Sequence, residues 1–180
     1  MKNIVFLADF YTDTIRGGAE IVNDILISGL ESRGYSVTKL RTYETSREEL
    51  EKYKECVFIV GNFVLLDPQL LEHLRSFEYI IFEHDHKYLK TRDPSGYRDY
   101  TAPPEDIIHR EFYKNATTVI CQSNIHAKVV RQNLNIANVV NIGCSLWSND
   151  ELEILRRYLG TPKKSACAVL QSNNRVKGTE

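Results

Sequence analysis

The stretch "NIVFLADFYTDTIRGGAEIVNDIL", residues 3–26, contains the pattern that decides the fold. Residues 3–8 are almost entirely apolar, which is typical of a parallel strand that is buried on both faces. Two adjacent glycines, Gly17 and Gly18, then precede a segment whose apolar residues recur at helical spacing. A buried strand, a glycine-containing loop and a helix in this order predict the first βα unit of a parallel sheet.

The same alternation continues along the chain. Besides residues 3–8, apolar runs that we expect to form strands lie at residues 36–41, 56–61, 79–83, 117–122 and 138–142. Helix start signals lie between or after these runs: the capping-box pairs Ser46/Glu49 and Ser148/Glu151, and the dipeptide Asp67-Pro68. Strand alternating with helix predicts an α/β fold, a Rossmann-like, doubly wound parallel sheet.

The composition is that of a globular domain, with 42% hydrophobic and 26% charged residues. The net charge of −1 argues against nucleic acid or an anionic membrane as a partner held mainly by charge. No apolar run approaches the ~18 residues of a membrane span, and the N-terminus lacks the cleavage site of a signal peptide. We therefore expect a cytoplasmic protein, with peripheral attachment at the inner membrane surface as a variant of that location.

The four cysteines, Cys56, Cys121, Cys144 and Cys167, are far apart and form no CxxC pair. Three of them lie in or beside apolar runs, where cysteine usually behaves as a small buried hydrophobe. We expect reduced core thiols rather than disulfides or metal ligands.

Gly17 and Gly18 lie where a doubly wound fold binds ligands, at the start of the helix after the first strand. Free backbone N–H groups at a helix start favour an anion, typically phosphate, and glycine lets it approach the backbone. The stretch matches neither GxGxxG nor GxxxxGK[ST], so a plain loop that leads into a helix is an equal alternative.

His84, Asp85 and His86 follow the fourth expected strand. A histidine beside a carboxylate can carry a proton, or can bind hydroxyls as a cation. Neighbours in an extended strand point to opposite faces, so the triplet offers at most two metal ligands on one side, and we expect no metal. A polar loop start without a function is the alternative. Three further histidines are expected on helices away from any strand end and receive no role: His73, His109 and His126.

Residues 87–103 form a long loop in which basic side chains alternate with tyrosines. Structureless loops of this length are often lids or binding segments, and this mixture suits sugars, phosphates or single-stranded nucleic acid. A solvated surface loop is an equal alternative.

Taken in order, several motifs resemble a known family. They are "GGAE" at 17–20, "RGYSV" at 33–37, "IIFEHDH" at 80–86, "ATTVICQSN" at 116–124, "VVNIGCS" at 139–145 and "AVLQSNNRVKG" at 168–178. Their sequence and spacing resemble the N-terminal half of retaining GT-B-fold glycosyltransferases of the group 1, family 4-like type, followed by the opening strand of the second domain.

This resemblance implies an acceptor-side domain at residues 1–160, then a linker and the first strand of a truncated donor-binding domain at 161–180. The whole enzyme would transfer a sugar from a nucleotide sugar to a glycan or lipid-linked acceptor, with retention and without a metal. It would need no cofactor, since the nucleotide sugar is a substrate. The carried-over roles are catalysis by His84 and Asp85, binding of the donor diphosphate by Gly17, Gly18 and Lys177, and an acceptor loop with His86, Tyr88, Arg92 and Arg98.

Two alternatives accompany this interpretation: a nucleotide-sugar epimerase of similar build, and a non-catalytic module that binds a glycan or assembles with a partner. The partners expected for the chain are a nucleotide sugar, an acceptor and the missing C-terminal domain, with no nucleic acid. An exposed strand edge at residues 166–170 would let copies pair as a homo-oligomer. We expect the 180 residues alone not to turn over, because the donor pocket would be absent.

Overall fold

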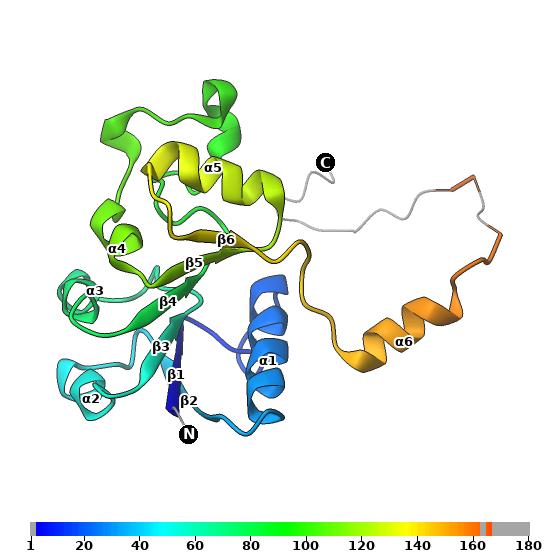
Figure 1. Ribbon diagram of the computed structural model, residues 1–180, viewed down its shortest axis with the longest axis horizontal. Coiled ribbons are helices and arrows are strands. Elements are labelled where there is room, and N and C mark those ends of the chain that lie inside the picture. The colour runs from blue at the N-terminus through cyan, green and yellow to red at the C-terminus, as the bar shows by residue number, and fades with distance from the viewer. Residues whose placement is uncertain (1–2, 163–164, 167–180) are drawn as a thin grey trace. The chain divides into compact units, whose positions relative to one another are not determined.

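The computed structural model describes residues 3–162 and 165–166. Six strands form one all-parallel sheet in the order β2-β1-β3-β4-β5-β6 (Figure 1). The strands are β1 (Asn3–Ala8), β2 (Ser36–Arg41), β3 (Val57–Val60), β4 (Tyr79–Phe82), β5 (Thr118–Cys121) and β6 (Val139–Asn141). The predicted α/β, Rossmann-like fold is confirmed, and each predicted strand is present, four of them one residue shorter at one or both ends.

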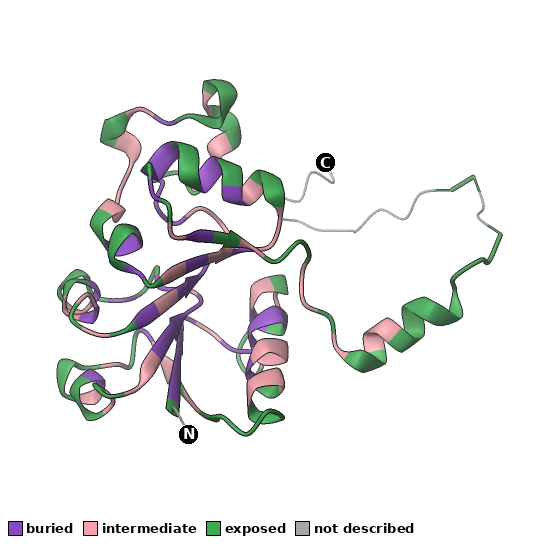
Figure 2. Ribbon diagram, viewed as in Figure 1, coloured by how far each residue is buried: buried purple, intermediate pink, exposed green. Residues whose placement is uncertain are grey.

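Helices cover both faces of the sheet. They are α1 (Gly18–Glu31), α2 (Arg47–Lys52), α3 (Pro68–Leu74), α4 (Arg110–Asn115) and α5 (Asn124–Leu134). Helix α1 packs on one face and α2 to α5 pack on the other (Figure 1). Alternate side chains of β1 follow this division: Val5 and Leu7 join the core with α2 to α5, and Phe6 joins the core with α1. Buried residues accordingly follow the strands (Figure 2).

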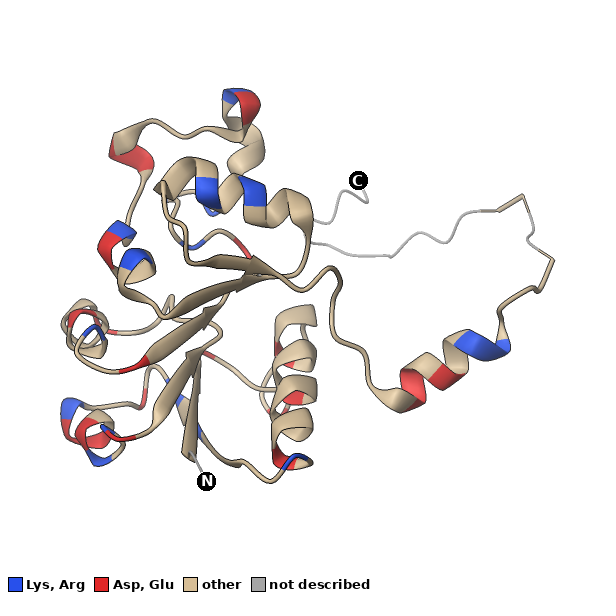
Figure 3. Ribbon diagram, viewed as in Figure 1, with Lys and Arg blue, Asp and Glu red and all other residues tan. Residues whose placement is uncertain are grey.

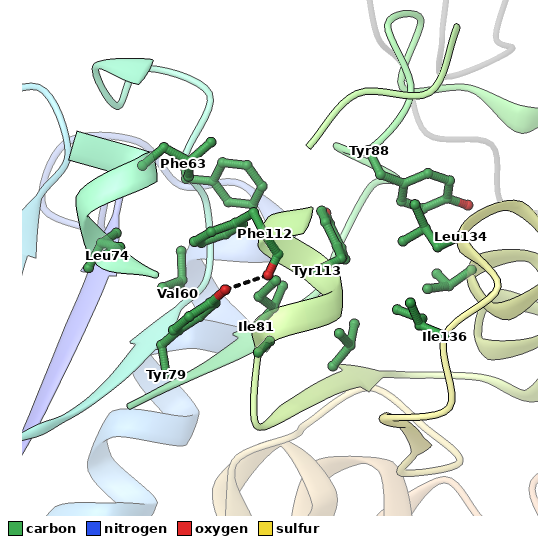
Figure 4. Close-up of a cluster of buried hydrophobic side chains, with 14 of the residues drawn as sticks. Val60, Phe63, Leu74, Tyr79, Ile81, Tyr88, Phe112, Tyr113, Leu134 and Ile136 are labelled. Carbon is green, nitrogen blue, oxygen red and sulfur yellow. Dashed lines mark hydrogen bonds between the residues drawn. The ribbon is translucent and has the colours of Figure 1, made fainter. Parts of the chain in front are cut away.

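An aromatic layer fills the larger of the two cores (Figure 4). The ring of Tyr79 on β4 stacks on that of Phe112 on α4 with 4.7 Å between centroids, and its hydroxyl donates to the Phe112 carbonyl oxygen at 2.5 Å. Phe63, in the loop after β3, packs edge-on against Phe112 at 5.2 Å. Offset and edge-on pairs of this kind stabilise a core beyond their buried area. They hold the loop after β3 and helix α4 against the sheet.

The helix starts follow the predicted signals. Asp67 accepts a hydrogen bond from the Gln69 N–H at 2.7 Å with Pro68 at the first helical position, and Ser46 accepts one from the Glu49 N–H at 3.2 Å. At the other end of α1, Gly34 has a φ of +85°, the left-handed conformation that glycine tolerates best.

The long connection after β4 is not the structureless loop that the sequence suggested. It contains three short 3₁₀ turns, η1 (Pro94–Gly96), η2 (Arg98–Tyr100) and η3 (Pro104–Asp106). Side chains of α5 hold it: Gln132 donates to the Asp99 carbonyl oxygen at 3.1 Å, and Asn133 donates to that of Tyr100 at 2.8 Å. Non-glycine residues with left-handed backbone are concentrated around it: His86, Arg92, Asp99, Tyr100 and His109.

A second unit of the chain begins at Ser148. Its described part contains α6 (Asn149–Arg157), which starts with the predicted capping box. The Ser148 hydroxyl accepts from the Glu151 N–H at 3.2 Å, and a Glu151 carboxylate oxygen accepts from the Ser148 N–H at 2.8 Å. The predicted domain boundary near residue 160 stays a prediction. Lys177 and the strand expected at residues 166–170 lie outside the described residues, apart from residue 166.

Charged residues lie on helices, on loops and on the edge strand β2, whereas β1 and β3 to β6 contain none (Figure 3). None of the described helices is long and apolar enough to cross a lipid bilayer. Cys56, Cys121 and Cys144 are free thiols. Cys121 is buried in the larger core, and burial raises its pKa to about 12, whereas Cys56 is partly buried and packs against the same core. The core prediction is wrong for Cys144, which is exposed because it follows the edge strand β6, beyond the helices that cover the sheet. Cys167 lies outside the described residues.

Candidate functional site at the carboxyl edge of the sheet

Strand β1 lies between β2 and β3, so the order of strands reverses at this point of the sheet. Doubly wound folds bind ligands beyond the carboxyl ends of the strands at such a reversal. The loops after β1, β3, β4 and β5 all leave from this edge, because all strands are parallel. Most of the residues selected from the sequence lie on these loops.

The start of α1 is open. Gly17 precedes the helix in an extended conformation, and no described side chain caps it. The first helical hydrogen bond runs from the Ile21 N–H to the Gly17 carbonyl oxygen at 3.1 Å, which leaves the N–H groups of residues 18–20 without helical partners. A side-chain carbon placed on Gly18 would meet nothing within 4 Å. This helix start can therefore receive an anion at Gly18.

Gly17 has a different environment. A side-chain carbon there would lie 2.3 Å from Oε2 of Glu20, whose side chain folds back over the helix start. Glu20 is only 8% exposed. A carboxylate near a helix N-terminus is favourable, but it also disfavours a second negative charge on its own side. The two glycines thus differ: Gly17 makes room for Glu20, and Gly18 presents an unobstructed backbone.

Asp9, at the end of β1, fixes the shape of this edge. It is 2% exposed, and its carboxylate accepts hydrogen bonds from the Thr42 hydroxyl at 2.5 Å and from the N–H groups of Val64 and Leu65 at 3.0 and 3.1 Å. One side chain thereby connects the loops that follow β1, β2 and β3. The Asp9 carboxylate thus holds these loops together through hydrogen bonds, a role that the sequence did not reveal.

His84 emerges from β4 and is held by two amides. Its Nε2 lies 2.9 Å from Oδ1 of Asn23 on α1, and its Nδ1 lies 3.0 Å from Nε2 of Gln122, which directly follows β5. Its ring also packs against the Phe82 ring with 4.7 Å between centroids. Burial, assisted by the nearby Lys87 ammonium, lowers the pKa of His84 to about 4. At neutral pH the imidazole is uncharged.

Asp85 belongs to a cluster of ion pairs. Lys87 Nζ lies 2.6 Å from Asp85 Oδ1 and 3.1 Å from Oε1 of Glu83, and Arg92 Nη2 lies 2.6 Å from Asp85 Oδ2. Glu83 and Lys87 are almost fully buried, and the Tyr113 hydroxyl donates to Glu83. Burial alone would raise the pKa of Glu83, but Lys87 and Tyr113 hold it at about 2. The cluster is thus a charged anchor for the start of the long loop.

His86 forms a second group with residues on other parts of the chain. Its Nδ1 lies 2.8 Å from the Tyr88 hydroxyl, and its ring centroid lies 4.4 Å from that of His126 on α5. Burial and the neighbouring His126 lower the pKa of His86 to about 4. The expectation that His126 lies away from any strand end is wrong, because only two residues separate β5 from α5, whose cap is Ser123.

The expected acceptor-loop residues therefore have different surroundings. Tyr88 is fully buried, and Arg92 is paired with Asp85. The side chain of Arg98 is 97% exposed and lies 3.7 Å from Asp99, so the described contacts do not connect it to His84.

The sequence did not point to Asn23, Gln122 and Tyr113. Asn23 and Gln122 contact His84, and the ring of Tyr113 contacts that of Tyr88. A signal existed for Asn23, a polar residue next to Val22 on the inward face of α1. Gln122 is at the end of a strand in a parallel sheet, where ligand-binding side chains gather.

Within residues 3–162 and 165–166, no group of three or more His, Cys, Asp or Glu side chains is arranged to hold a metal ion. Neither a protein-family model nor a curated protein matches the chain.

Proposed function

We propose that this chain is the acceptor-side domain of a GT-B-type glycosyltransferase that moves a sugar from a nucleotide sugar to a glycan or lipid-linked acceptor. The observation that carries the proposal is the start of α1 at the strand reversal, where Gly18 presents an unobstructed backbone beside the side chain of Glu20. The order of motifs along the chain adds the reaction class.

The chemistry follows from the charge that develops in the reaction. Departure of a nucleoside diphosphate places negative charge on its oxygens, and backbone N–H groups at a helix start stabilise such charge without a metal. In this proposal the N–H groups of residues 18–20 contact the diphosphate. His84 and Asp85 border the reacting sugar, and retention of configuration is part of the proposal.

One observation favours a second candidate. Both nitrogens of His84 and both carboxylate oxygens of Asp85 already have partners within the protein. Side chains whose polar atoms are already engaged in this way also suit a module that binds a sugar nucleotide or glycan without catalysing its transfer.

A titration followed by NMR tests the binding step. The amide signals of residues 18–20 should shift saturably with UDP or GDP and much less with uridine or guanosine. Gly18→Ala should weaken this binding about tenfold, which corresponds to 1.4 kcal/mol, because the new methyl group occupies the approach to the backbone.

Gly29→Ala is the matched control, since it lies on the same helix and its methyl group would meet only the Arg33 guanidinium at 3.6 Å. It should leave binding unchanged. The proposal would be contradicted if the diphosphates shifted the signals of other amides instead. It would also be contradicted if Gly18→Ala and Gly29→Ala bound them equally well.

A further inference from the structure

Both nitrogens of one imidazole are hydrogen-bonded to side-chain amides that come from opposite parts of the fold. Asn23 is on α1, on one face of the sheet, and Gln122 is in the connection between β5 and α5. His84, at the end of β4, lies between them at 2.9 and 3.0 Å. His84 and Gln122 follow the carboxyl ends of their strands, and Asn23 lies in the first half of α1.

The partner atoms decide where the imidazole proton lies. The side-chain nitrogen of Gln122 can only donate, so Nδ1 of His84 must accept. The single proton of the neutral ring is therefore on Nε2, from which it is donated to Oδ1 of Asn23. Both hydrogen bonds agree on one tautomer.

The arrangement has a cost at Asn23. Its side chain is fully buried, and its Nδ2 has no hydrogen-bond partner among the described residues. A buried donor without a partner is unfavourable, and a hydrocarbon side chain at this position would avoid it. The presence of an amide here is better explained by its hydrogen bond to His84 than by core stability.

We propose that Asn23 and Gln122 are positioning residues of the carboxyl-edge site, which hold His84 as the neutral tautomer with its proton on Nε2. His84 then presents a fixed hydrogen-bonding edge and does not act as a proton carrier, because its lone pair and its proton are both engaged. A proton released in a sugar transfer goes to another group. The statement about the proton released in a sugar transfer rests on the proposed function, whereas the assignment of the tautomer does not.

The charged surroundings support a neutral ring. Glu83 and Asp85 on its own segment favour the imidazolium, whereas Lys87 and His126 on α5 oppose it. Lys87 neutralises much of the carboxylates' effect, since its ammonium lies within 3.1 Å of both. Burial then dominates, and the pKa of His84 falls to about 4.

Long-range ¹H–¹⁵N NMR of the imidazole rings in the whole chain at pH 7 tests the assignment. We expect separate His84 signals for a protonated Nε2 and an unprotonated Nδ1. A proton on Nδ1, an imidazolium or averaged signals of two tautomers would overturn it.

Gln122→Glu tests the positioning residues. The new carboxylate would accept from Nδ1, so the pKa of His84 should rise by about one unit or more. Gln69→Glu, the same change at an exposed position of α3, should leave it unchanged. If Gln122→Glu does not fold, Asn23→Asp places a carboxylate against Nε2 and should give the same rise. An unchanged pKa in a folded variant would overturn the proposal.

These results are independent of catalysis, because they need no ligand. A chain that binds no nucleotide would refute the proposed function and leave the tautomer standing. A wrong tautomer would refute the positioning role and leave nucleotide binding at Gly18 standing.

Discussion

At the end of β4, His84 makes hydrogen bonds to residues that are 61 and 38 positions away in the chain. Its importance was predictable, because a histidine directly after a buried strand lies at the edge where parallel sheets bind ligands. Its chemistry was not, because protonation depends on partners that only the fold brings together. The sequence suggested a proton carrier or a cation, whereas the structure contains a neutral ring with both nitrogens engaged.

Gly61 gives the first residue-scale prediction. A side-chain carbon at this position would lie 2.9 Å from Nδ2 of Asn23 and 3.0 Å from Cε1 of Phe6. Both neighbours are fully buried, so neither can move easily. Gly61→Ala should therefore lower the free energy of unfolding by about 1–3 kcal/mol, measured by urea denaturation.

Gly29→Ala is again the control for this prediction. Its methyl group has space within α1, so it should raise the free energy of unfolding by about 0.5–1 kcal/mol. Equal effects of the two substitutions would show that the contact between Gly61 and Asn23 is not tight.

Elements were predicted better than their connections. The bounds of β1 and β2 were predicted to the residue: β1 is a nearly continuous apolar run, and β2 is a short segment that follows the turn at Gly34. The long connection after β4 was predicted poorly, since its turns depend on α5, about thirty residues away. The position of His126 was missed for the same reason: the start of α5 faces the loop that carries His86.

Asn133 gives the prediction at the scale of elements. Its side chain accepts from the Ala102 N–H at 2.8 Å and donates to the Tyr100 and Val129 carbonyl oxygens at 2.8 and 2.9 Å. Asn133→Ala would leave buried backbone groups without partners. We expect hydrogen exchange of the amides at 99–102 to accelerate at least about tenfold, while the strands keep their protection.

Lys128→Ala, an exposed change on the same helix, should leave exchange at 99–102 unchanged. Equal protection of this segment in wild type and Asn133→Ala would show that α5 does not hold the loop.

For the whole molecule, the buried histidines make the free energy of unfolding depend on pH. The folded pKa of His84 and of His86 is about 4, below the ~6.5 of an unfolded chain. The unfolded state therefore binds more protons between these values, so stability is fully present above pH 6.5 and decreases as pH falls toward 4. His84 alone should reduce the free energy of unfolding by roughly 2 kcal/mol between pH 7 and pH 5.

Glu83 acts at lower pH. Its folded pKa of about 2 is below the ordinary value of 4.5, so its contribution is lost as pH falls from 4.5 toward 2. Urea denaturation at pH 7.5, 6, 5 and 4 should show a continuous decrease. A free energy of unfolding that stays constant from pH 7.5 to 5 would mean that these histidines are not buried as neutral rings.

A crystal structure of the chain soaked with a nucleoside diphosphate sugar tests the central claim most directly, namely that the carboxyl edge at the start of α1 is a diphosphate site. We predict a phosphate oxygen within hydrogen-bond distance of the N–H groups of Gly18 or Ala19, with His84 still bound to Asn23 and Gln122. A diphosphate bound elsewhere on the chain, with the start of α1 occupied only by water, would contradict it.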